Sequence, residues 1–136
     1  LVGLRGLPLP QAQQRGVDAK GGTMRLGAWQ AKVKKGTIAY DSYERYGGLL
    51  DKQTGLTSER HRHRYEFNDT YIKQFEAKGL IIAARSVVEN LVEIVELPRS
   101  VHPFYLGTQG HPEYKSRPLT PHPIFLEFVS AILGSI

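Results

Sequence analysis

The sequence predicts an α/β domain in which helices flank a mixed sheet. Residues 80–88 and 91–98 form two apolar runs of strand length, and residues 101–109 resemble a strand that is buried on both faces. Near the C-terminus, apolar residues recur instead at the spacing of a helix. Because the strands outnumber the helices, and the helices are too few to cover both faces, we expect only part of a larger sheet.

The N-terminal third predicts an irregular start, a strand and a short helix. Residues 1–20 carry glycine, proline and glutamine without periodicity, so we expect them to be irregular. Alternating apolar residues predict a strand over 23–33, with a kink at Gly27. A short helix is expected over 37–46, and the glycine-rich segment 47–57 is expected to be a loop.

The middle of the chain predicts a strand, a helix and a hairpin. Residue types alternate again over 59–68, first arginine with histidine and then aromatic with polar residues, which predicts a strand, and Asn68 can cap a helix that stops at Gly79. The two apolar runs that follow are joined by Glu89 and Asn90, which predicts a β-hairpin.

The C-terminal segment predicts a connector followed by a helix. Residues 115–123 are rich in proline, and Pro123 suits the first turn of a helix. The next apolar residues lie on one helical stripe, with Glu127 and Ser130 outside it, so we expect the stripe to cover one face of the sheet. The stripe consists of Ile124, Phe125, Phe128, Val129, Ile132 and Leu133.

Composition limits the chemistry that these 136 residues can perform. With 40% apolar and 23% charged residues, they have the composition of one soluble globular domain. They contain no cysteine, and so provide no disulfide, no thiolate metal ligand and no cysteine nucleophile. The net charge of +5 would suit a nucleic-acid surface, but the positive residues are spread along the chain, which favours a solvated surface instead.

The first residues of the sequence are informative about the cellular location of the protein. Residues 1–10 lack the pattern of a signal peptide, and no apolar window is long enough to span a bilayer. We therefore expect a cytoplasmic protein with no membrane partner. Because the first residue is Leu1 rather than methionine, we also expect the chain to be part of something longer.

The stretch GTQGHPEYKSRP, residues 107–118, carries a candidate pair of catalytic side chains. His111 and Glu113 are two residues apart, and on an extended chain they would point to the same face. A carboxylate in that position could hold an imidazole in one tautomer, as the third member of a nucleophile–base–orienter set does. A structural alternative is an exposed loop that happens to contain both residues.

The stretch ERHRHRYEFN, residues 59–68, alternates arginine with histidine. His61 and His63 would share one strand face and could bind a metal, but the flanking arginines would repel a cation, so we expect no metal site. Arginine suits a carboxylate or phosphate ligand, and Tyr65 follows directly. An RNA-binding patch and a charged edge strand are the alternatives.

Three motifs together carry a family resemblance. The stretch GGTMRLG at residues 21–27 is by itself only a weak phosphate-loop signal, since no Lys-Ser/Thr follows it. In combination with ERHRHRYEFN and GTQGHPEYKSRP, however, it resembles the C-terminal part of the class I glutamine amidotransferase domain of the CTP synthase family. The resemblance runs from about Val17 to about Leu133, and it implies part of a flavodoxin-like three-layer fold.

The resemblance implies roles for individual residues. In that family a Cys-His-Glu triad frees ammonia from glutamine, so His111 corresponds to the base and Glu113 to its orienter. Arg64 corresponds to the arginine that holds the α-carboxylate of glutamine, with the backbone of Tyr65 beside it. The remaining motif residues, for which no individual role is implied, are expected near the active site and a GTP-responsive lid: Thr23, Arg25 and Arg62.

The resemblance also implies partners. The complete enzyme would join the glutaminase to a synthetase domain, where ATP and Mg²⁺ serve the amination of UTP to CTP and GTP is an activator; it would be a homotetramer. No cofactor is expected on this chain itself. The cysteine elbow is expected in a missing N-terminal half of the amidotransferase domain, so we expect the isolated chain to be inactive. The alternatives are a non-catalytic amidotransferase-like module for binding or assembly and, third, an RNA-binding protein.

Overall fold

A computed structural model describes residues 24–134 of the chain. The expected irregular start at 1–20 and the candidate residue Thr23 lie outside this part. In chain order the helices and strands are β1 (Arg25–Val33), α2 (Ile38–Tyr46), β2 (Leu49–Asp51), β3 (Leu56–His63), α3 (Ile72–Ala77), β4 (Ile81–Ser86), β5 (Val92–Glu96), β6 (Leu106–Thr108) and α4 (Pro123–Ile132), with short 3₁₀ turns at Asp69–Tyr71 and Pro112–Tyr114.

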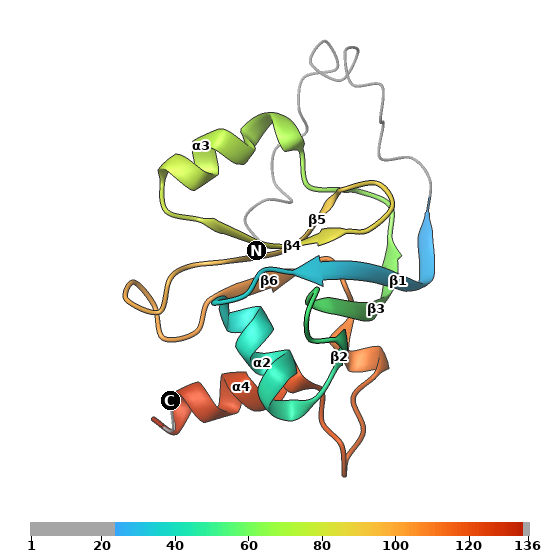
Figure 1. Ribbon diagram of the computed structural model, residues 1–136, viewed down its shortest axis with the longest axis vertical. Helices are drawn as coiled ribbons and strands as arrows, with labels where there is room; N and C mark the ends of the chain where they lie inside the picture. Colours follow the sequence, from blue (N-terminus) through green and yellow to red (C-terminus); the bar gives the residue numbers. More distant parts are fainter. Residues whose placement is uncertain (1–23, 135–136) are drawn as a thin grey trace.

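The six strands form one sheet in the order β2-β3-β1-β4-β5-β6, and each described pair of strands is antiparallel. Figure 1 shows α2 and α4 side by side on one face of this sheet and α3 on the other side. The fold is the α/β class that the sequence predicts, but the expected mixed sheet is antiparallel in every described pair of strands. No helix between residues 24 and 134 has the length and apolar character needed to cross a membrane.

The hydrophobic core lies between the sheet and the two helices α2 and α4. Alternate residues of β1 point into it, so Ala31 and Val33 are buried while Lys32 between them is exposed. Phe104 and Leu106 pack against its edge. The buried members of the core are Ala31, Val33, Ala39, Tyr40, Tyr43, Ala83, Ala84, Ile94 and Ile124.

The N-terminus of α2 is fixed by two side chains. Thr37 is the N-cap residue, and its hydroxyl accepts a hydrogen bond from the backbone N–H of Tyr40. The buried carboxylate of Glu96 on β5 accepts from the N–H groups of Ile38 and Ala39 at 2.8 and 3.1 Å. Free N–H groups and a partial positive charge at a helix start favour such an anion, so Glu96 ties α2 to the sheet.

The predicted hairpin is confirmed. β4 and β5 pair antiparallel, and Asn90 in the connection has a φ of 56°. Asparagine adopts this left-handed conformation more readily than most residues, which explains its place in the turn. The expected helix before the hairpin also forms, but only over Ile72–Ala77, because Asn68 caps the preceding 3₁₀ turn instead of the helix itself.

Three predicted boundaries are wrong. The segment 47–57 is not all loop, since it contains β2 and the first residues of β3. The strand predicted over 59–68 ends at His63. The strand predicted over 101–109 is reduced to the half-buried edge strand β6, because the chain turns at Pro98, where the carbonyl accepts from the N–H of Val101. The strand whose residues are all buried is β5.

Candidate active site

His111 and Glu113 lie in contact, although not on an extended chain. His111 precedes the 3₁₀ turn Pro112–Tyr114, and this turn folds Glu113 back toward the imidazole. The distance from His111 Nδ1 to Glu113 Oε1 is 2.7 Å. The structure thus brings together the pair that the sequence singled out, while the extended geometry expected for it is wrong.

This contact sets the tautomer of His111. A carboxylate only accepts hydrogen bonds, so a neutral imidazole beside it carries its proton on Nδ1 and presents a lone pair at Nε2. Burial raises the pKa of Glu113, but the hydrogen bond from His111 and a backbone hydrogen bond outweigh burial and leave the pKa below its usual value. Nε2 of His111 is then the atom that can accept a proton from a nucleophile.

The segment around His111 is held against β3 by a backbone hydrogen bond and a close approach at Gly110. The N–H of His111 donates to the carbonyl of Arg60 at 2.7 Å, and the imidazole stacks on Tyr114 with ring centroids 5.1 Å apart. A Cβ atom at Gly110 would lie 2.9 Å from Cβ of Glu59, so only glycine fits this close approach without a shift of the strand. This segment is therefore built onto the strand that carries the arginine–histidine run.

The three arginines of that run are exposed. Arg60 and Arg62 alternate with the inward-facing His61 and His63, and Arg64 follows just after β3 ends. Among residues 24–134, the guanidinium of Arg64 has no hydrogen-bond or ion-pair partner, which leaves it available to a ligand carboxylate. Tyr65 is 78% exposed, and its backbone carbonyl contacts Nδ1 of His63 at 3.1 Å.

Arg25 differs from the exposed arginines because it is buried and ion-paired. Its guanidinium contacts Glu93 at 2.6 Å and Glu66 at 3.4 Å, and it lies over the ring of Trp29. In the register of the sheet Arg25 is opposite His63. Arg25 therefore joins β1 to β5 and to the segment after β3 rather than presenting its charge to solvent.

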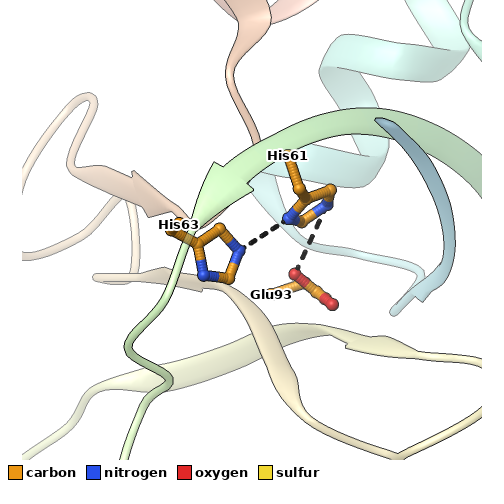
Figure 2. A group of neighbouring side chains, drawn as sticks. All are labelled: His61, His63 and Glu93. Carbon is orange, nitrogen blue, oxygen red and sulfur yellow. Dashed lines mark hydrogen bonds and ion pairs between the residues drawn. The ribbon is translucent and has the colours of Figure 1, made fainter. Parts of the chain in front are cut away.

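His61, His63 and Glu93 form a compact group beside Arg25. Figure 2 shows the two imidazoles next to each other on β3 and the carboxylate reaching toward them from β5. Nδ1 of His61 lies 2.8 Å from Nε2 of His63, and Nε2 of His61 lies 3.7 Å from Oε2 of Glu93. Burial, followed by the charge of Arg25, lowers the pKa of His61 to about 3, so this ring is neutral at neutral pH.

A second group of buried polar side chains consists of Glu59, Tyr43 and His122. Oε1 of Glu59 accepts hydrogen bonds from the Tyr43 hydroxyl at 3.0 Å and from Nε2 of His122 at 2.9 Å. His122 also caps α4, since its Nδ1 accepts from the N–H of Ile124. Burial and the neighbouring Glu59 carboxylate raise the pKa of Tyr43, which keeps its hydroxyl a donor. This group connects α2, β3 and α4.

Sequence reasoning did not identify Glu59, Glu93 or His122 as members of these groups. A signal for Glu93 was present, because a charged residue inside the apolar run of residues 91–98 has to be buried and therefore needs partners. The partners themselves lie on other strands and could not be read from local spacing. Alternation on β3 could have indicated Glu59, which shares a face with His61.

Comparison with known proteins identifies the domain type. The family model for glutamine amidotransferase class-I matches residues 12–131, which is most of the chain. The CTP synthase of Caldanaerobacter subterraneus subsp. tengcongensis is 50% identical over 122 residues, covering 90% of this chain and 21% of that protein. The CTP synthase of Aeropyrum pernix is 50% identical over 120 residues, covering 88% of this chain and 20% of that protein. The chain thus spans about a fifth of the length of these curated relatives.

A solved structure gives the same family and the same kind of fold. The glutaminase domain of Trypanosoma brucei CTPS with bound acivicin matches with a TM-score of 0.67 and 34% sequence identity. The match covers 80% of this chain and 39% of that chain.

Proposed function

Because the chain belongs to the class I glutamine amidotransferase family, we propose that it is the C-terminal part of the glutaminase of a CTP synthase. In this role it serves the release of ammonia from glutamine for the ATP-dependent amination of UTP to CTP. The observation that carries the proposal is the 2.7 Å contact between His111 and Glu113, which prepares the imidazole as a base in a domain of this family.

The proposed chemistry assigns one proton path to His111. Its Nε2 takes the proton of a cysteine thiol, and the thiolate attacks the side-chain carbonyl carbon of glutamine. The same proton then passes to the leaving nitrogen, which departs as ammonia and leaves a thioester that water hydrolyses to glutamate. Glu113 is a positioning residue that holds the productive tautomer. The 136 residues contain no cysteine, so the thiol comes from sequence outside them.

Arg64 and Tyr65 are proposed to hold the substrate. The exposed guanidinium of Arg64 would form a two-point contact with the α-carboxylate of glutamine, and the Tyr65 backbone would lie beside it. The complete enzyme would be a cytoplasmic homotetramer whose synthetase domain uses ATP and Mg²⁺ and whose glutaminase responds to GTP. Arg62 and Arg25 are proposed to lie near that GTP-responsive region.

A non-catalytic binding or assembly module is the second candidate. The observation that favours it is the absence of cysteine from these 136 residues, because the exposed arginine could bind glutamine without any covalent step. The two candidates differ in what happens when the remaining part of the domain is added.

Complementation tests the proposal. The chain is co-expressed with the CTP synthase of Caldanaerobacter subterraneus truncated so that it lacks the matched region, and glutamine-dependent ammonia release is measured. We expect activity from the combination and none above background from either part alone. His111→Ala should abolish that activity, whereas His102→Ala, an exposed histidine on the loop between β5 and β6, should leave it unchanged. Assembly without activity would favour the non-catalytic module.

A further inference from the structure

Four groups form a continuous row from the end of β3 to β5. The carbonyl of Tyr65 lies 3.1 Å from Nδ1 of His63, and Nε2 of His63 lies 2.8 Å from Nδ1 of His61. The row ends where Nε2 of His61 faces Oε2 of Glu93 at 3.7 Å. Each of these three contacts joins two atoms that carry lone pairs, so each needs a proton or a cation between them.

Two neutral imidazoles provide only two N–H groups for three contacts. If Nδ1 of each ring is protonated, His63 donates to the Tyr65 carbonyl and His61 donates to His63. The lone pair on Nε2 of His61 then faces Oε2 of Glu93, an atom that is buried and has no hydrogen-bond partner among the described residues. The opposite pair of tautomers moves the unfilled contact to the Tyr65 carbonyl. In either arrangement, one of the three contacts joins two lone pairs with no proton between them. That contact needs an additional proton or a cation.

The charges around the row also favour a cation. With neutral imidazoles, the single guanidinium of Arg25 faces two carboxylates, Glu66 and Glu93, so the group carries one net negative charge. An unbalanced buried charge is costly. The arginines that flank the histidines in sequence do not compensate it, because Arg60 and Arg62 point to the other face of β3 and are exposed. The flanking arginines therefore do not act on this face, where the charge of Arg25, which opposes a cation, is outweighed by the two carboxylates.

We propose that His61, His63 and Glu93 bind one divalent transition metal ion, for which zinc is the best-suited candidate. Two imidazoles and one carboxylate are a known zinc donor set, and one ligand atom from each residue lies within 4.8 Å of the others. Ligand atoms around a tetrahedral zinc ion at about 2.0–2.1 Å are separated by about 3.3–3.4 Å. Only one nitrogen of His61 can bind the ion. The 3.7 Å separation between its Nε2 and Oε2 of Glu93 is close to this value, whereas the 2.8 Å contact involves its Nδ1, so Nε2 of His63 has to shift toward an ion bound at Nε2 of His61.

The outer contacts of these ligands also fit a metal site. When Nε2 of His63 binds the ion, its Nδ1–H still donates to the Tyr65 carbonyl, and Oε1 of Glu93 still accepts from Arg25. Metal-bound histidines and carboxylates commonly make such second contacts, which fix their orientation. The ion would join β3 to β5 and would hold the backbone of Tyr65. This inference goes beyond the proposed glutaminase function and does not depend on it.

Zinc titration of the tag-free full chain tests the site. Isothermal calorimetry at neutral pH should show one zinc ion per chain with a dissociation constant in the micromolar range or tighter, and cobalt should give the visible absorption of a tetrahedral ion. His63→Gln removes a ligand at the partly exposed end of β3 and should weaken zinc binding by about 100-fold, and Glu93→Gln should do the same. The control His102→Ala, outside the group, should leave the affinity unchanged.

Two outcomes would overturn the proposal. If zinc does not bind at about millimolar concentration, the third contact is filled by a proton instead. If a folded His63→Gln chain, verified by circular dichroism, binds zinc as tightly as the unaltered chain, the ion lies elsewhere. Because His63 is only at the end of its strand, this variant decides the question even where Glu93→Gln fails to fold.

Discussion

At the residue scale, the contact between His111 and Glu113 makes a pH-dependent prediction. Replacing His111 by Ala removes the imidazole hydrogen bond that lowers the Glu113 pKa and leaves burial opposed only by a backbone hydrogen bond, so the pKa should rise toward its usual value. Carbon-detected NMR titration of the Glu113 carboxyl measures this shift. Because the folded-state pKa lies below 4.5, the pair stabilises the fold above that pH, and the stabilisation is lost as pH falls through the folded value. An unchanged pKa in His111→Ala would contradict the contact.

Arg64 makes a second prediction at this scale. In the complemented enzyme, Arg64→Lys replaces a two-point contact with glutamine by a single point charge, and a charged hydrogen bond contributes about 1.5–3 kcal/mol. We therefore expect kcat/KM for glutamine to fall roughly 10- to 150-fold, while CTP formation from free ammonia stays nearly constant. The matched control is Arg117→Lys, an exposed arginine whose Nη1 contacts only backbone carbonyls. Equal loss with both nitrogen sources would place Arg64 outside the glutamine pocket.

Single residues also show where sequence reasoning succeeds and where it stops. His111 and Glu113 could be singled out because they are neighbours in sequence, and the turn that joins them is local. Glu93 could not be assigned to His61 because the two lie on strands that are separated by 28 intervening residues of sequence and meet only in the folded sheet. The same holds for the pairing of Glu59 with His122. Spacing finds local pairs, whereas long-range pairs depend on topology.

At the scale of elements, the cap of α2 makes a stability prediction. Thr37→Ala removes the hydroxyl that accepts from the N–H of Tyr40, and loss of such a cap costs about 0.5–2 kcal/mol. Urea denaturation of the isolated chain should show this decrease in the free energy of unfolding. Thr120→Ala, at an exposed position that takes part only through its backbone, is the control and should change stability by less than about 0.5 kcal/mol. A similar loss in both variants would contradict a special role for the cap.

Helix α4 shows how an element can be predicted correctly and oriented wrongly. The sequence places its start at Pro123 and its apolar stripe correctly, but the face expected outside is the one that is buried. Glu127 has no exposed surface and pairs with Arg45 and Arg99, which carry the opposite charge from α2 and from the loop after β5. The periodicity of apolar residues identifies the stripe, but it does not tell whether the stripe faces the sheet or the solvent. The exposed part of the stripe comprises Phe125, Phe128, Val129, Ile132 and Leu133.

At the scale of the whole molecule, this exposed stripe points to a missing neighbour. Large apolar residues gathered on one helix face usually mark a contact surface. The matched region covers only 39% of the Trypanosoma brucei glutaminase chain, so a larger part of such a domain has no counterpart in these residues. If the proposed role as part of a glutaminase is right, the outer face of α4 is a surface on which the rest of that domain would pack.

Lysine substitutions on the outer face of α4 test whether this face is needed for assembly rather than for folding. In the double variant Val129→Lys with Ile132→Lys, both changes fall on residues that are at least half exposed, so the isolated chain should lose less than about 0.5 kcal/mol of stability per site. Complementation should nevertheless fail, because the two charges would have to be buried without partners when the rest of the domain docks. Gln74→Lys with Ala77→Lys adds the same charge to exposed positions of α3 and is the matched control. If the α4 variant assembled and released ammonia as well as this control, the apolar face of α4 would not be where the rest of the domain binds.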